Sequence, residues 1–148
     1  MTLTTTLNLL KEAKACQNRY KILVKALGKD YGKDMPIPLL KVLESNGLDD
    51  TLWAFRAVLA EQAQARDKLC RLCACDFAEH VLSIFEHAFP DDKRPRQAIE
   101  TSRRYANGEA TDKELAAVWA TARAVAAAAE TAVELEWQTE HLQKLLMD

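Results

Sequence analysis

Glycine and proline are scarce in this chain, with four of each among its 148 residues. All but Gly47 fall within residues 28–38 or 90–108. Because both residue types interrupt helices, the long stretches between them can form helices without a break. Alternating runs of β-branched residues are also rare, which argues against strands. We therefore predict an all-α fold without a sheet, with six or seven helices in an irregular bundle that ends in a long Ala-rich helix.

An excess of charge of either sign is also absent. Lysine and arginine together number 20 and aspartate and glutamate 22, which gives a formal net charge of −2. Proteins that bind nucleic acids in general usually carry a basic excess. We therefore expect no direct contact with nucleic acid.

The sequence predicts neither a membrane span nor a secretion signal. The longest weakly polar run, residues 124–129, is far shorter than the ~20 apolar residues of a membrane helix. The N-terminus lacks the basic start, apolar stretch and small-residue cleavage site of a signal peptide. We expect a cytoplasmic protein without membrane contact, whose four cysteines are reduced.

Catalytic signatures are missing as well. No glycine-rich phosphate loop and no nucleophile elbow is present. Asp76, His80, Ser83 and His87 share one edge of a predicted helix, where an Asp–His pair could move a proton. Residues one turn apart on a straight helix seldom surround a substrate, however. We predict that the protein is not an enzyme and has no catalytic residues.

Three cysteines, Cys70, Cys73 and Cys75, invite comparison with a zinc site. Structural zinc needs four ligands that converge from separate segments, and here the cysteines share one predicted helix with no second ligand pair elsewhere. Free thiols explain them better. We predict no metal site and no cofactor.

Helical periodicity and end signals define the expected elements. A loop is expected at 28–38, and Thr111 and Glu114 form a capping box at the start of the last helix. The helices are expected at about 6–14, 17–27, 38–45, 49–59, 62–88, 94–107 and 111–146. The apolar face of the 62–88 helix is expected to comprise Cys70, Ala74, Phe77, Val81, Ile84, Phe85 and Ala88.

The segment FPDDKRPR, residues 89–96, is the most distinctive in the chain. Pro90 cannot continue the preceding helix, Asp91 or Asp92 can cap the next one, and Pro95 suits its first turn. Four arginines in and just after this segment could bind phosphate or carboxylate groups of a partner, or could pair internally with Asp91, Asp92 and Glu100. They are Arg94, Arg96, Arg103 and Arg104.

Candidate contacts for a partner come from charged turns and one tryptophan. Asp49 and Asp50 stand at the start of a predicted helix. Either of them can cap this helix, and both can face solvent. Trp137 lies in a charged segment and is the tryptophan best placed to anchor a partner. With Asp91, Asp92 and the four arginines, these residues form the predicted partner-binding set.

Residues 75–109 followed by a capped Ala-rich helix resemble the Imm-5-like immunity proteins of bacteria and their phages. The resemblance rests on VLSIFE at 81–86, PDDKRPR at 90–96 and the Ala- and Trp-rich stretch 116–137. Residues 36–58 also look like the front half of uncharacterised phage proteins that carry this tail. We expect one helical domain, 1–148, made of an N-terminal segment 1–60 and an Imm-5-like segment 61–148.

The resemblance implies a protein that works by covering another protein, and it brings no catalytic residues with it. The first hypothesis is an immunity protein that occludes a toxin or nuclease. The second is a phage-encoded inhibitor of a host defence system, such as an anti-CRISPR protein. A third is a structural or oligomerisation module, in which the chain forms homo-oligomers. The PDDKRPR turn serves in these hypotheses either as a scaffold or as a contact site.

Overall fold

The computed structural model describes residues 2–118 and 132–147. These residues form eight α-helices and almost no strand, which confirms the all-α class and exceeds the expected helix number by one or two. The chain divides into two compact units: unit 1 is Met1–Arg66 with Glu136–Asp148, and unit 2 is Asp67–Leu135. The segments 1–60 and 61–148 remain a prediction. Among the described helices, none is both long and apolar enough to cross a membrane.

Unit 1 contains a short antiparallel strand pair that the sequence did not predict. β1 (Thr4–Thr5) pairs with β2 (Ile37–Pro38). Thr5 is fully buried, and its hydroxyl donates a hydrogen bond of 2.6 Å to the carbonyl of Ala57. Both contacts join residues that are distant in the sequence. The expectation of no sheet was therefore wrong at this point, because no local pattern reveals such a pairing.

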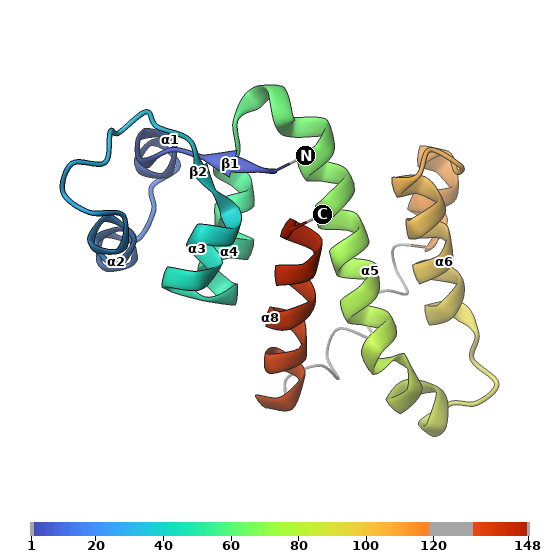
Figure 1. Ribbon diagram of the computed structural model, residues 1–148. Helices are drawn as coiled ribbons and strands as arrows, with labels where there is room; N and C mark the ends of the chain where they lie inside the picture. Colours follow the sequence, from blue (N-terminus) through green and yellow to red (C-terminus); the bar gives the residue numbers. More distant parts are fainter. Residues whose placement is uncertain (1, 119–131, 148) are drawn as a thin grey trace. The chain divides into compact units, whose positions relative to one another are not determined.

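The helices of unit 1 follow local signals more closely (Figure 1). The α2 helix has the predicted bounds, whereas α4 begins before Asp49 and has Gly47 as its N-cap. The expected capping by Asp49 or Asp50 was wrong: both lie in the first turn instead. The elements are α1 (Leu7–Glu12), α2 (Gln17–Leu27), α3 (Leu39–Asn46), α4 (Leu48–Ala54) and the 3₁₀ turns η1 (Phe55–Ala57) and η2 (Ala60–Gln62).

Gly47 explains where α4 starts. Its φ of 86° and ψ of −176° belong to a region that is essentially restricted to glycine. Its carbonyl accepts hydrogen bonds from the backbone N–H of Thr51 at 3.2 Å and from the Thr51 hydroxyl at 2.8 Å. The chain can therefore leave α3 and enter α4 within a single residue.

Gln62 ties the N-terminal residues to the rest of unit 1. Its side-chain oxygen accepts from the backbone N–H of Thr4 at 2.8 Å, and its amide nitrogen donates to the carbonyl of Thr2 at 3.0 Å. Gln62 is itself buried. The surrounding core of unit 1 includes Leu7, Leu10, Leu23, Ile37, Leu39, Val42, Leu43, Ala54, Phe55 and Val58.

Unit 2 is built on two neighbouring helices joined by the PDDKRPR turn, α5 (Ala63–Ala88) and α6 (Arg94–Ala106) (Figure 1). They share a small core made of Cys75, Ala78, Val81, Leu82 and Ile99. Residues 75, 78 and 82 recur at helical spacing, so α5 presents this stripe to α6.

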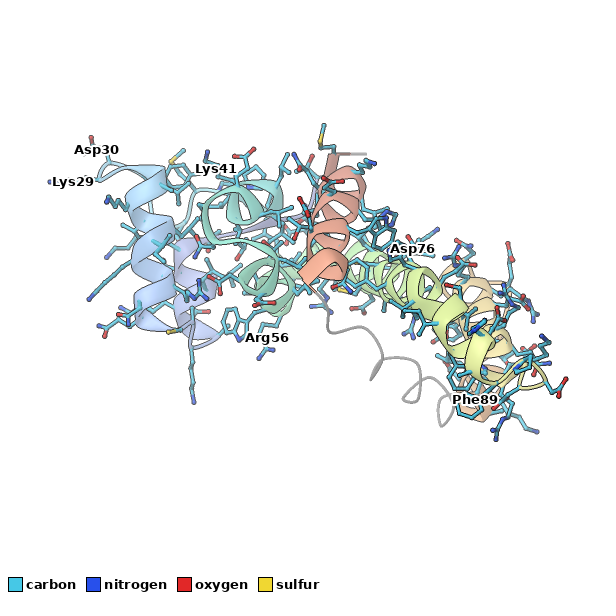
Figure 2. The ribbon with its side chains drawn as sticks, turned by 90° about the horizontal axis from the view of Figure 1, so that it is seen from below. Lys29, Asp30, Lys41, Arg56, Asp76 and Phe89 are labelled. Atoms are coloured by element: carbon cyan, nitrogen blue, oxygen red, sulfur yellow. The ribbon has the colours of Figure 1, made fainter. Side chains whose placement is uncertain are left out.

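The apolar face predicted for α5 was partly wrong. Val81 is buried as expected, but Ala74 and Ala88 are exposed and Ile84 is 58% exposed. Cys75, which was not part of the predicted face, is buried instead. The helix carries apolar residues on more than one side, and the position of α6 selects the stripe that is covered. Figure 2 shows Phe89 at the end of α5, where it is 57% exposed.

The capping box after α6 is confirmed. Glu114 accepts from the backbone N–H and hydroxyl of Thr111, both at 2.8 Å, and its own N–H faces the Thr111 hydroxyl at 3.3 Å. The helix that follows is described for residues 112–118, and α8 (Ala132–Met147) ends the chain. The middle of the helix expected at 111–146, residues 119–131, lies outside the described residues.

Candidate functional site

The arginines of unit 2 are held by carboxylates of the same unit. Arg94 binds Asp92 with both nitrogens of its fork, at 2.8 and 2.6 Å, while its backbone N–H donates to the same carboxylate at 3.1 Å. The side-chain and backbone hydrogen bonds from Arg94 lower the pKa of Asp92 to about 2. The N-cap residue of α6 is Lys93 and makes no side-chain cap hydrogen bond, so the expected capping by Asp91 or Asp92 was wrong. Asp92 instead accepts from the backbone N–H of Arg94, and Asp91 is exposed.

Two further arginines join α6 to α5. Arg96 donates to Glu86 at 2.8 and 2.6 Å, and this pairing lowers the pKa of Glu86. Arg103 donates from one terminal nitrogen to Asp76 at 2.6 Å and to Glu79 at 2.5 Å. Such charge-assisted bonds fix the geometry of the two helices as well as stabilising them.

Arg104 contacts the segment after α6. It donates to the carbonyl of Glu109 at 3.0 Å and lies 3.4 Å from the carboxylate of Glu114. Nearby, the Tyr105 hydroxyl donates to Asp112 at 2.5 Å, and this bond raises the pKa of Tyr105.

These contacts favour the scaffold interpretation of the PDDKRPR turn. Arg94, Arg96, Arg103 and Arg104 pair within unit 2, and their partners are mainly carboxylates of α5 and of the 109–114 segment rather than Asp91 and Glu100. A partner that used these arginines would have to compete with the pairs already formed.

The cysteines of α5 are free thiols in the structure. Cys73 and Cys75 are buried, and burial raises the pKa of both, that of Cys73 to about 12. The Cys75 thiol points to the carbonyl of Ile99 at 3.8 Å. Within the described part of the chain, no three His, Cys, Asp or Glu side chains are grouped to hold a metal ion.

The edge of α5 that carries Asp76, His80, Ser83 and His87 takes part in the same ion-pair network through Asp76. Asp76 accepts from Arg103, and His80, Ser83 and His87 lie exposed along the helix. The edge therefore presents an exposed stripe whose aspartate is already paired with Arg103.

Unit 2 also has a cavity of about 380 Å³ between α5 and α6. Its wall is largely apolar, with polar groups at Asp67, Arg71 and Ser102. Arg71 lies over the ring of Tyr105, with its guanidinium carbon 4.7 Å from the ring centroid. None of the predicted partner-binding residues lines this cavity.

Unit 1 contains a pocket of about 230 Å³ that includes two predicted residues, Asp49 and Asp50. It lies between α1, α2, the end of α3 and α4. The pocket combines an apolar wall with a polar rim. It is lined by Leu10, Ala15, Cys16, Arg19, Tyr20, Leu23, Asn46, Asp49, Asp50 and Trp53.

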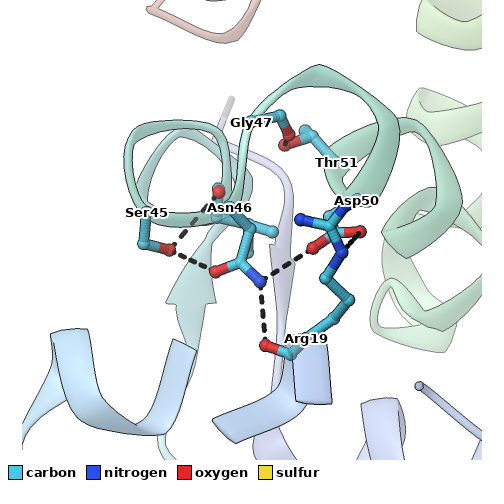
Figure 3. A network of polar contacts seen from close by, with 7 residues as sticks. Arg19, Ser45, Asn46, Gly47, Asp50 and Thr51 are labelled. Atoms are coloured by element: carbon cyan, nitrogen blue, oxygen red, sulfur yellow. Dashed lines mark hydrogen bonds and ion pairs between the residues drawn. The ribbon is translucent and has the colours of Figure 1, made fainter. Parts of the chain in front are cut away.

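Asn46 organises the polar side of this pocket (Figure 3). Its amide nitrogen donates to the carbonyl of Arg19 at 2.9 Å and to the carboxylate of Asp50 at 2.8 Å. Its amide oxygen accepts from the hydroxyl of Ser45 at 2.7 Å. The Arg19 guanidinium completes the network 3.6 Å from Asp50. One side chain thus connects α2, α3 and α4.

Asp49 differs from its neighbour. Asp50 is partly buried and bound by Asn46, whereas Asp49 is exposed and its carboxylate makes no hydrogen bond or ion pair with any described residue. At the other edge of α4, the guanidinium carbon of Arg56 lies 4.8 Å from the centroid of the Trp53 ring. Arg56 also donates to the Trp53 carbonyl at 3.1 Å, so it is held on its own turn.

Cys16 stands at the N-terminus of α2, exposed, on the rim of the pocket. The backbone N–H groups of Arg19 and then Asn18 favour its thiolate and lower the pKa of Cys16. No local sequence pattern singles out Cys16, Tyr20 or Asn46. Their common location depends on how α2 packs against α3 and α4. In the sequence, Asn46 indicates only the end of a helix.

Trp137 lies on α8 in unit 1 and is half-buried. Its ring stacks on that of His141 one turn later, with centroids 4.8 Å apart and planes at 9°. Its use as a partner anchor remains a prediction.

Comparison with known proteins gives one match. Residues 59–137 match the model of the family described as "Imm-5 like putative immunity protein". The match covers more than half of the chain and all of unit 2. No curated protein and no solved structure matches.

Proposed function

Since the chain belongs to the Imm-5-like immunity protein family, we propose that it is a non-catalytic inhibitor that binds and covers a toxin or nuclease. An immunity protein protects its host by binding the toxin, so membership of this family favours a protein partner. This match is the observation that carries the proposal. We place the inhibitor in the cytoplasm, where its thiols stay reduced.

The geometry supports binding through unit 1 more than through the PDDKRPR turn. The four arginines beside that turn are engaged within unit 2, whereas Asp49 offers an uncompensated carboxylate beside an open pocket. Complementary charge speeds encounter and selects among partners. An acidic pocket rim suits a nuclease, because enzymes that bind nucleic acid usually carry basic surfaces.

The proposal can be tested against any toxin or nuclease that a neighbouring gene encodes. The purified toxin is titrated with the full-length protein, and residual toxin activity is measured. We expect inhibition to saturate near one equivalent and to weaken with added salt. The Asp30→Asn variant removes one exposed charge of unit 1 outside the pocket and serves as a control with unchanged inhibition (Figure 2).

An enzyme would behave differently in the same assay. Inhibition at far less than one equivalent that grows with incubation time would contradict a stoichiometric inhibitor. A toxin that remains fully active at a large excess of the protein would exclude it as the partner.

A further inference from the structure

The pocket of unit 1 has the size of a site for one side chain. Its volume of about 230 Å³ is below the ~300–1,000 Å³ typical of small-molecule sites. Side-chain anchors in protein interfaces fill such pockets, and tryptophan, tyrosine and arginine dominate among them.

The charges around the pocket favour a cation. Its rim carries the carboxylates of Asp49 and Asp50 and only one basic side chain, Arg19. Arg19 stands 3.6 Å from Asp50, which also accepts from Asn46. The carboxylate of Asp49 has no ion pair or hydrogen bond within residues 2–118 and 132–147. One negative charge is therefore left without compensation.

The wall of the pocket favours a flat cation over a compact one. Tyr20 and Trp53 supply aromatic surface, and Leu10 and Leu23 supply aliphatic surface. A guanidinium stacks on aromatic rings and binds carboxylates with two parallel bonds, whereas an ammonium ion is a strongly hydrated point charge. The chain already places one guanidinium, that of Arg56, against the Trp53 ring.

We propose that this pocket receives an arginine side chain of the protein partner, whose guanidinium binds Asp49 while its aliphatic stem lies along the apolar wall. This inference rests on the proposed function and deepens it, because it names the anchor that the toxin or nuclease supplies. Arg19 remains paired with Asp50 in the complex.

The test uses the full-length protein and three small probes. They are N-acetyl-arginine methylamide, its uncharged isostere N-acetyl-citrulline methylamide, and N-acetyl-lysine methylamide. Binding is followed by the indole N–H signal of Trp53 in NMR spectra and by the rate at which Cys16 is alkylated. The Cys16 thiol lies on the pocket rim, so an occupant should shield it.

We expect a saturable response to the arginine probe with half-saturation at about 1–10 mM, as suits a single side chain. Cys16 alkylation should slow severalfold at saturation. The lysine probe should bind severalfold more weakly and the citrulline probe should give no response. Asp49→Asn should remove most of the response, and Asp30→Asn, which lies beyond the other end of α2, should leave it intact (Figure 2).

Equal responses to the arginine and citrulline probes, or to the arginine and lysine probes, would overturn the inference. A response unchanged in Asp49→Asn with a circular dichroism spectrum like that of the wild type would do the same. None of these results depends on the toxin assay. Stoichiometric inhibition without any arginine response would therefore leave the proposed function standing and reject this anchor alone.

Discussion

Arg96 on α6 and Glu86 on α5 face each other with two parallel hydrogen bonds of 2.8 and 2.6 Å. The pair bridges the two ends of the PDDKRPR turn, and the second pair of that turn, Arg94 with Asp92, lies within it. Exposed ion pairs contribute little to stability one by one, but the bidentate geometry restrains direction. The turn therefore sets the angle at which α6 leaves α5.

Acid should weaken unit 2 in a defined window. Pairing lowers the pKa of Glu86 and of Asp92, the latter from 3.8 to about 2. A carboxyl with a lowered pKa stabilises the fold above its unfolded pKa, and this contribution is lost as the pH falls through the folded pKa. We expect the melting temperature, followed by circular dichroism, to fall between about pH 4 and pH 2 beyond the fall in a Glu86→Gln, Asp92→Asn double variant. Parallel acid profiles for the two proteins would refute this origin.

Loss of the Gln62 amide should destabilise unit 1. In Gln62→Leu the N–H of Thr4 and the carbonyl of Thr2 lose their partner. Thr4 is partly buried, so its unpaired N–H should cost about 1–3 kcal/mol, which urea unfolding can measure. Gln64→Leu changes an exposed glutamine two residues later and is the matched control. Equal losses in the two variants would show that the buried amide has no special role.

Substitutions at Asp49 and at Asp50 should affect association with the partner and thermal stability to different degrees. Asp49→Lys alters an exposed and unpaired charge, so it should slow association with the partner severalfold and leave the melting temperature nearly unchanged. Asp50→Lys breaks the bonds to Asn46 and Arg19 and should lower the melting temperature as well. Surface plasmon resonance and thermal unfolding measure the two effects. A stable Asp50→Lys protein would mean that the network of Figure 3 does not support the fold.

The exposed thiol of Cys16 should react much faster than the two buried thiols. Cys16 is exposed and its pKa is lowered. A disulfide reagent should therefore modify it rapidly, even at a pH at which an ordinary cysteine thiol is protonated. Cys73 and Cys75 are buried with raised pKa values and should react only on the timescale of unfolding. Cys16→Ser should remove the fast phase. A fast phase that persists in this variant would assign the reactivity to another cysteine.

Local signals in the sequence predicted the helices well. The bounds of α2, the start of α6 at Arg94 and the Thr111–Glu114 capping box all depend on residues within a few positions of one another. The β1–β2 pair and the covered face of α5 depend on contacts between distant segments, and both were missed or misplaced. Periodicity could not choose between the apolar sides of α5, because the choice is made by α6.

The candidate site was predicted only in part. The paired aspartates marked Asp49 and Asp50, but the pocket beside them also needs Cys16, Tyr20 and Asn46, from α2 and the end of α3. The arginines stood out by their density, although their carboxylate partners on α5 could not be inferred from spacing alone. Three hypotheses remain predictions because they differ only in the partner that the protein binds. They are toxin immunity, phage counter-defence and homo-oligomer formation.

Unit 1 is discontinuous, since Glu136–Asp148 belongs to it together with Met1–Arg66. Leu142 and Leu146 in its second stretch are buried residues. The first stretch of unit 1 therefore leaves the ribosome long before these leucines have been synthesised, and chains begin to fold from their N-terminal parts as they emerge. Unit 1 can therefore complete its core only after all of unit 2 has been synthesised, although its own residues come first in the chain.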